Sequence, residues 1–234
     1  MSITLEEFGR FEYLLFNVMQ ASIVVPMVVV WARRRFFSAP VRLLSWYVYL
    51  SLFSVVGARF FLIGTPPNNH WYLIAFNCGK IALFAAVYYQ VLRQPNARRL
   101  VFSVTAATLP LLLLASLYDT QLGISVSRVA HCALLAGFAL LYFDQFASRT
   151  TTLPLSKDSL WLVSMGQILY SAVTVSFFSY GYFATGQSVW LYIFMDVGGL
   201  IFNYFLTLAF LRARSTELGA STSESQSVNM LLKQ

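Results

Sequence analysis

The chain has 234 residues, of which 58% are hydrophobic and only 11% are charged, whereas a soluble domain carries roughly 25% charged residues. So much apolar surface cannot be buried in one water-soluble core of this size, and this excludes an ordinary soluble domain. In a chain this apolar, the net charge of +7 indicates the sorting of helices across a bilayer, and no nucleic-acid partner is expected.

Seven segments are each long and apolar enough to cross a bilayer as a helix, which requires about 20 predominantly apolar residues. In chain order they are residues 11–31, 43–63, 71–92, 100–118, 128–147, 159–181 and 189–211. Backbone polar groups in lipid must be satisfied within each segment, so the sequence predicts an all-α seven-transmembrane-helix bundle over residues 1–214. Pro26 and Pro110 are expected to kink the first and fourth helices. The Ser-rich stretch 215–234 is expected to be a disordered tail.

Basic residues are distributed very unequally between the two sides of the predicted bundle. The side that receives the C-terminus carries twelve of them: Arg33, Arg34, Arg35, Arg42, Arg93, Arg98, Arg99, Arg149, Lys157, Arg212, Arg214 and Lys233. The other side carries two, Arg10 and Arg128. The positive-inside rule therefore places the N-terminus outside and the C-terminus in the cytoplasm.

The first and last parts of the sequence resemble each other when the sequence is compared with itself at an offset of 119 residues. Trp71 then falls on Trp190 and Arg93 on Arg212. The first three segments fall on the last three, and the fourth has no counterpart. Such a three-plus-one-plus-three plan of parallel repeats is used by small transporters. The alternative is a chance resemblance between apolar helices.

One lysine, Lys80, lies inside the hydrophobic stretch from Trp71 to Leu92. A charge at the centre of a membrane helix costs about 2.5–3.5 kcal/mol on insertion scales and usually finds a partner in the bundle. Counted from the outer ends of their helices, Lys80 lies about 14 Å deep and Asp196 about 9 Å deep. We expect the two side chains to pair as the floor of an outward-facing polar pocket for a small molecule. The alternative is a buried salt bridge that orients helices and binds nothing.

Five more polar residues complete the ligand-binding candidates: Asn77, Arg59, His131, Asn203 and Gln167. Two stripes in the last two segments recur at intervals of three or four residues and so predict one polar helix face each. They are Ser164, Gln167, Ser171 and Thr174, and then Asp196, Asn203 and Thr207. Polar contacts between membrane helices are the alternative reading of these stripes.

A row of small residues marks the third segment: Ala75, Gly79, Ala82 and Ala86. Small residues allow two membrane helices to approach closely. The row therefore predicts a close-packed seam between the third helix and a neighbour.

Several membrane enzyme chemistries lack the residues they need. The seventh segment has no lysine for a retinal linkage, and His70 and His131 are the only histidines for a zinc site. No G-x-S-x-G or S-x-x-K nucleophile motif occurs. Cys78 and Cys132 fall in separate apolar runs and are expected to be unpaired, buried thiols. We expect no enzyme activity, no cofactor and no bound metal.

Two stretches resemble a loose group of uncharacterised bacterial seven-transmembrane-helix proteins. They are NNHWYLIAFNCGKIALFAAVYYQVL at 68–92 and WLVSMGQILYSAVTVSFF at 161–178, the latter followed by the last helix. Members of the group are similar to membrane sensor input modules that elsewhere precede histidine kinases. The resemblance implies a sensor in the bacterial inner membrane. Members tend to carry carboxylates near the positions of Arg59 and Lys80, whereas both residues are basic here.

Three functions follow from these observations. The first is a sensor or receptor-like module with an outer ligand pocket, which signals to a separate cytoplasmic protein. The second is a small transporter built from the two repeats, and the third is a membrane scaffold without a ligand. The concentration of polar residues in the outer half of the bundle favours the sensor. The lipid bilayer is a partner in all three.

Overall fold

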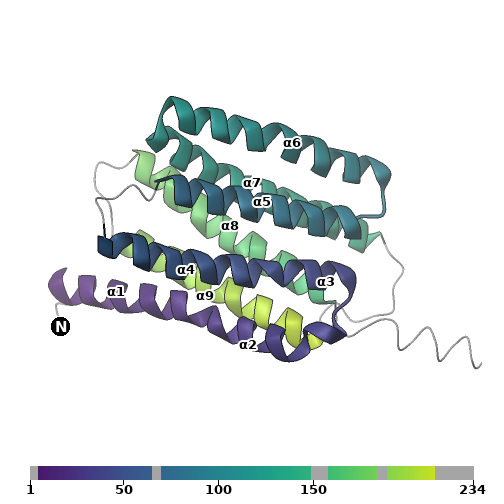
Figure 1. The fold of residues 1–234 in the computed structure, drawn as a ribbon, viewed down its shortest axis with the longest axis horizontal. Helices are drawn as coiled ribbons and strands as arrows, with labels where there is room; N and C mark the ends of the chain where they lie inside the picture. The colour runs from purple at the N-terminus through teal and green to yellow at the C-terminus, as the bar shows by residue number, and fades with distance from the viewer. Residues whose placement is uncertain (1–4, 65–69, 149–157, 184–188, 214–234) are drawn as a thin grey trace, which may run out of the picture.

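The computed structural model describes residues 5–64, 70–148, 158–183 and 189–213. The tail predicted over 215–234 lies outside these residues. The described chain is all-helical (Figure 1) and consists of α1 (Leu5–Ser22), α2 (Val24–Arg33), the short 3₁₀ helix η1 (Arg34–Phe36), α3 (Ala39–Leu44), α4 (Trp46–Gly64), α5 (His70–Val91), α6 (Pro95–Tyr118), α7 (Thr120–Ala147), α8 (Ser159–Phe183) and α9 (Val189–Arg212).

These helices confirm the expected seven spans, because seven described stretches are long and apolar enough to cross a membrane. The first span is α1 with α2, the second is α3 with α4, and the helices α5 to α9 supply one span each. The chain is therefore a multi-pass membrane protein.

Two of the spans are interrupted, for different reasons. The first breaks at Ile23, one turn before Pro26, where the proline nitrogen has no hydrogen to donate to the carbonyl of Ser22. The second breaks at Ser45, whose hydroxyl donates a 2.6 Å hydrogen bond to the carbonyl of Arg42. Side-chain bonding of this kind competes with the helical ladder, and the sequence analysis missed it. Pro110 lies inside α6, which continues through it without a break.

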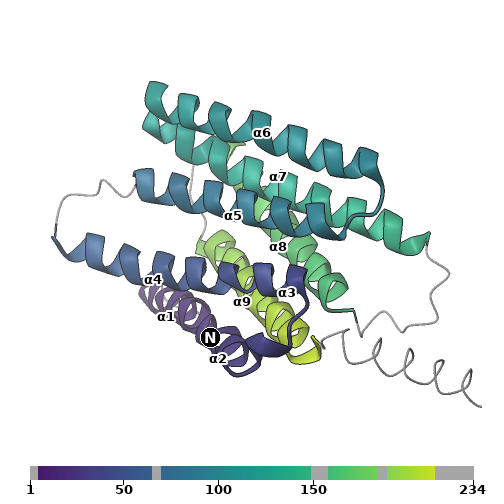
Figure 2. The same cartoon turned by 45° about the vertical axis from the view of Figure 1, so that its right-hand side comes forward.

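Six of the spans form a closed ring, and the fourth lies outside it (Figures 1 and 2). Around the ring, α1 and α2 pack on α9, α9 on α8, α8 on α7, α7 on α5, and α5 on α3 and α4. Contacts between α2 and α4 close the circle. The outer helix α6 packs along α5 and α7, and both views place it at the edge of the bundle.

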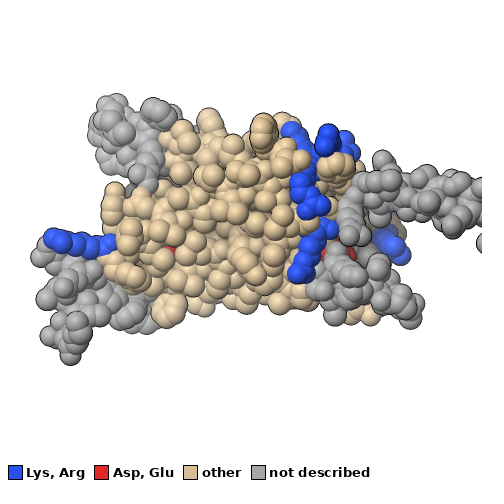
Figure 3. All heavy atoms as spheres, turned by 90° about the horizontal axis from the view of Figure 1, so that it is seen from below, with Lys and Arg blue, Asp and Glu red and all other residues tan. Residues whose placement is uncertain are grey.

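One end of the bundle is basic (Figure 3). A band of Lys and Arg side chains crosses the surface there, next to a broad body that is almost entirely uncharged. We call it the basic end, and its described arginines are Arg33, Arg34, Arg35, Arg42, Arg93, Arg98, Arg99 and Arg212. Two of them hold helix ends as well: Arg33 donates to the carbonyl of Leu211, and Arg98 donates to the carbonyl of Leu92. A cation at a helix C-terminus is favourable because the last carbonyls lack partners.

One close helix contact occurs where the sequence analysis did not expect it. An ideal Cβ on Gly166 of α8 would lie 2.7 Å from the Cβ of Phe205 on α9, so only glycine fits there. The predicted seam on α5 is wrong, because Ala75, Ala82 and Ala86 are exposed and Gly79 is half-buried. This row faces the outside of the bundle.

Candidate functional site

The ammonium of Lys80 is enclosed by aromatic rings near the middle of the bundle. Its side chain is 3% exposed. The nitrogen lies 4.5 Å from the ring centroid of Tyr170, and 5.4 Å from those of Tyr47 and Phe202. All three distances are within the range of a cation–π interaction, and the Tyr47 side chain is also a hydrogen-bonding partner. We call these three rings the Lys80 cage.

The cage brings together four helices of the ring. Lys80 belongs to α5, Tyr47 to α4, Tyr170 to α8 and Phe202 to α9. The rings also support one another, because the centroids of Tyr47 and Phe202 lie 5.6 Å apart and those of Tyr170 and Phe202 lie 5.9 Å apart. Any movement of the amine must therefore change contacts on several helices at once.

The expected pairing of Lys80 with Asp196 is wrong. Asp196 is 1% exposed, but neither of its carboxylate oxygens has a hydrogen-bond partner among the residues that the structure describes. Among the described residues, Glu12 on α1 is the charged group that acts on this carboxylate. The directions of the side chains explain this: Asp196 and Phe202 lie about 120° apart around α9, so only Phe202 faces the lysine.

Asp196 instead occupies the face of α9 that meets α1. Asn203 lies two turns further along α9, within about 20° of the same direction. Its amide donates a 2.7 Å hydrogen bond to the hydroxyl of Ser22 on α1. The methionine Met19 of α1 also approaches Gly199 on this face. Asp196 is thus a buried carboxylate at the α1–α9 contact, away from the Lys80 cage.

His131 of α7 lies beside the cage. Its ring centroid is 6.3 Å from that of Tyr170, and its Nε2 lies 3.4 Å from the sulfur of Cys132. Both His131 and Cys132 are buried, and Cys132 is a free thiol, as expected. The other cysteine, Cys78, is also free but half-buried.

The amide candidates make hydrogen bonds within and between helices. Asn77 of α5 donates to the hydroxyl of Ser127 on α7 at 3.0 Å. Gln167 donates to Ser171 on its own helix at 2.9 Å, while its carbonyl oxygen is buried without a partner. These bonds support the alternative reading of such residues as contacts that hold membrane helices together.

The polar stripe on α8 lies on a buried face, as its spacing predicted. Ser164, Gln167, Ser171 and Thr174 are all buried. On α9, Asp196 and Asn203 are buried and Thr207 is half-buried. Arg59 belongs to α4, but its side chain lies outside the described residues.

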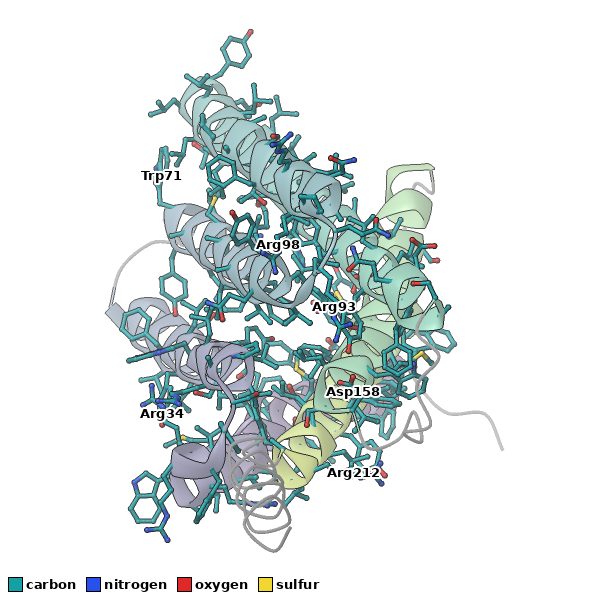
Figure 4. All side chains as sticks on the ribbon, turned by 90° about the vertical axis from the view of Figure 1, so that its right-hand side faces the viewer. Arg34, Trp71, Arg93, Arg98, Asp158 and Arg212 are labelled. Atoms are coloured by element: carbon teal, nitrogen blue, oxygen red, sulfur yellow. The ribbon has the colours of Figure 1, made fainter. Side chains whose placement is uncertain are left out.

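A chain of aromatic contacts runs from the cage to the basic end. Phe84 lies 6.4 Å from Phe202, and Tyr88 follows at 6.5 Å from Phe84. Tyr142 lies 6.2 Å from Tyr88, and its hydroxyl donates a 2.6 Å hydrogen bond to the carboxylate of Asp158. Asp158 in turn accepts hydrogen bonds from the first backbone N–H groups of α8 and is visible at this end in Figure 4.

No protein family, curated protein or solved structure matches this chain. The function proposed below therefore rests on the geometry of the site.

The described candidates form an enclosed polar core and not the open outer pocket that was expected. The six whose side chains are described are at most 8% exposed; they are Lys80, Asp196, Asn77, His131, Asn203 and Gln167. A ligand can reach this core only if helices move apart. Sequence reasoning missed Tyr47, Tyr170 and Phe202, because aromatic residues make up 17% of the chain and nothing in their spacing distinguishes these three.

Proposed function

We propose that the chain is a membrane sensor or receptor-like module. The observation that carries this proposal is the Lys80 cage, in which a buried cation joins α5 to α4, α8 and α9 without a carboxylate partner among the described residues. A stimulus that moves the amine, such as an anionic ligand, would change the packing of these helices together. The aromatic contacts from Phe84 to Tyr142 supply a packed route from the cage to the basic end.

The direction of signalling follows from the charge asymmetry of the sequence. Under the positive-inside rule the basic end faces the cytoplasm of a bacterial inner membrane, with the N-terminus outside. Exposed arginines at this end, including Arg93 and Arg99, offer contacts to a separate cytoplasmic signalling protein. The enclosed polar core then lies between an outer stimulus and an inner partner.

Distance measurements between spin labels at the basic end test this proposal. Labels are placed on cysteines introduced at two exposed positions, Gln94 after the end of α5 and Leu211 in the last turn of α9. In this variant Cys78 and Cys132 are replaced by serine. Lys80→Met should shift the distance distribution in lipid nanodiscs, because it removes the charge that contacts rings on α4, α8 and α9.

Ser116→Ala is the matched control for this experiment. Ser116 is also buried, but it bonds to the carbonyl of Leu112 on its own helix α6, outside the ring. The control should leave the distribution unchanged. If Lys80→Met changes the distribution no more than Ser116→Ala does, the cage does not communicate with the basic end and the sensor proposal fails.

A small transporter is the second candidate, and the arrangement of the helix ring favours it. The 119-residue shift places α1 on α7 and α5 on α9. If the two repeats are related by a two-fold axis, the α5–α7 contact is equivalent to the α9–α1 contact, and both pairs of helices pack together. This pattern is expected of parallel repeats related by an axis along the membrane normal.

The reactivity of Cys132 separates the two candidates. It is buried beside His131, next to the Lys80 cage, and Cys78→Ser leaves it as the single thiol. Alternating access would let a membrane-impermeant maleimide reach it from each side of oriented vesicles in turn. A sensor predicts labelling from one side at most, while a cysteine at the exposed position Gln94 serves as the positive control for the basic side.

A further inference from the structure

An apolar groove lies between α4 and α5 on the outside of the bundle. It has a volume of about 420 Å³ and is lined by Trp46, Tyr49, Leu50, Phe53, Gly79 and Leu83. Trp46 is 52% exposed and Phe53 67% exposed, so the groove opens to the surrounding lipid. It is separate from the Lys80 cage, which lies on the inner side of these helices.

One of the small residues on α5 lines the groove. Gly79 forms part of its wall, and an ideal Cβ there would lie 3.3 Å from a methyl group of Leu50. Ala75, Ala82 and Ala86 lie on the exposed side of the same helix. A larger side chain at position 79 would press against Leu50, so the glycine keeps this part of the groove open to a flexible apolar chain.

A cation lies at the end of the groove nearest the basic end. The guanidinium carbon of Arg34 lies 4.7 Å from the ring centroid of Trp46 and 5.7 Å from that of Tyr49, and both rings line the groove. Figure 4 shows Arg34 beside α4, on the flank of the bundle. Other arginines gather at the same end, so the local potential is positive (Figure 3).

The carboxylates of the described residues lie elsewhere. Asp144 and Asp158, the described acidic residues at the basic end, belong to α7 and to the start of α8, and Asp158 is bonded to Tyr142. Arg34 therefore keeps its charge available for a ligand at the membrane surface.

We propose that this groove binds one anionic phospholipid from the leaflet at the basic end. An acyl chain lies along Leu50, Phe53 and Leu83, and the headgroup phosphate pairs with Arg34. Trp46 and Tyr49 lie between the two, at the level where aromatic side chains are favoured in a bilayer. Phosphatidylcholine also carries a phosphate, but its choline balances the charge, so the preference is for lipids with a net negative charge.

The size and chemistry of the groove favour an acyl chain over a protein helix. A helix with its side chains is about 10–12 Å wide and would need a longer apolar face than the eight residues from Trp46 to Phe53, which span roughly 10 Å. A charged mouth next to an apolar channel also matches the two parts of a lipid. This site does not depend on the proposed sensor function.

Quenching of Trp46 fluorescence by brominated lipids tests the proposal. The reporter is a variant in which Trp46 is the single tryptophan, with the other four replaced by phenylalanine. It is placed in phosphatidylcholine bilayers that contain increasing amounts of phosphatidylglycerol or phosphatidylcholine with brominated acyl chains. Phosphatidylglycerol should quench at about fivefold lower mole fraction, the effect expected of one basic residue near the membrane surface.

Three further substitutions in the reporter locate the charge that causes the preference. Arg34→Gln should bring quenching by phosphatidylglycerol to the level of phosphatidylcholine, and Arg34→Lys should keep most of the preference. Arg99→Gln removes the same charge from an exposed position on α6, away from the groove, and should keep the preference as well.

Two results would overturn the proposal. One is equal quenching by the two lipids in the reporter. The other is an equal loss of preference in the Arg34→Gln and Arg99→Gln variants, which would mean that the whole basic end attracts anionic lipid without a defined site.

Discussion

A double-mutant cycle between Lys80 and Asp196 is the most direct test of how charge is arranged in this bundle. The cycle compares Lys80→Met, Asp196→Asn and the double variant. Neither carboxylate oxygen of Asp196 has a hydrogen-bond partner, and the amine of Lys80 lies among three rings. The two changes in the free energy of unfolding should therefore add to within about 0.5 kcal/mol.

The size of the Lys80→Met effect follows from two opposing terms. Removing the ammonium loses a cation–π interaction of about 2 kcal/mol for a desolvated pair. It also removes the cost of placing a charge in the membrane, about 2.5–3.5 kcal/mol. We expect a stability within about 1 kcal/mol of the parent, or slightly higher. Breaking a buried salt bridge would instead cost about 3–5 kcal/mol.

The free energies are measured by reversible unfolding in mixed micelles of dodecyl sulfate and a mild detergent. A second cycle, between Lys80→Met and Tyr170→Leu, is the positive control, because the amine lies 4.5 Å from that ring. It should give a coupling of about 1 kcal/mol or more. A coupling above about 1.5 kcal/mol between Lys80 and Asp196, or none between Lys80 and Tyr170, would refute the proposed charge arrangement.

Two further predictions concern packing and a hydrogen bond, and the same unfolding assay measures both. Gly166→Ala should destabilise the protein by about 1–3 kcal/mol, because its new Cβ would lie 2.7 Å from Phe205. Gly137→Ala, which meets no atom within 4 Å, should be neutral or stabilising, and a similar loss in both variants would contradict the packing argument. Tyr142→Phe should cost about 1.5–3 kcal/mol, because it removes the 2.6 Å hydrogen bond from Tyr142 to Asp158. Tyr89→Phe, at an exposed position, is the control. If the two variants are equally stable, the prediction is contradicted.

Features that repeat along the sequence could be predicted well. The seven spans follow from runs of apolar residues, since a bilayer imposes a minimum helix length. The buried stripe from Ser164 to Thr174 follows from its helical period. The interruption near Pro26 follows from the chemistry of one residue, because proline has no backbone N–H.

Features that depend on the rotation of one helix against another could not be predicted. Depth in the membrane can be counted from a helix end, and it motivated the expected pairing of Lys80 with Asp196. The direction of a side chain depends on which neighbour packs on which face, and the sequence does not contain that information. The same limit explains the row from Ala75 to Ala86, which suits a helix contact equally well but faces lipid.

The surroundings of Lys80 bear on why a charged residue is there at all. Three rings and neighbouring apolar side chains would accommodate methionine, which has a similar length and no charge to bury. If the two energetic terms nearly cancel, the fold gains little from the ammonium. Its contribution is then a charge held where α4, α5, α8 and α9 meet, in a position to respond to an anion or to a change in the packing of these helices. This is the property that a sensor requires and that a passive scaffold does not.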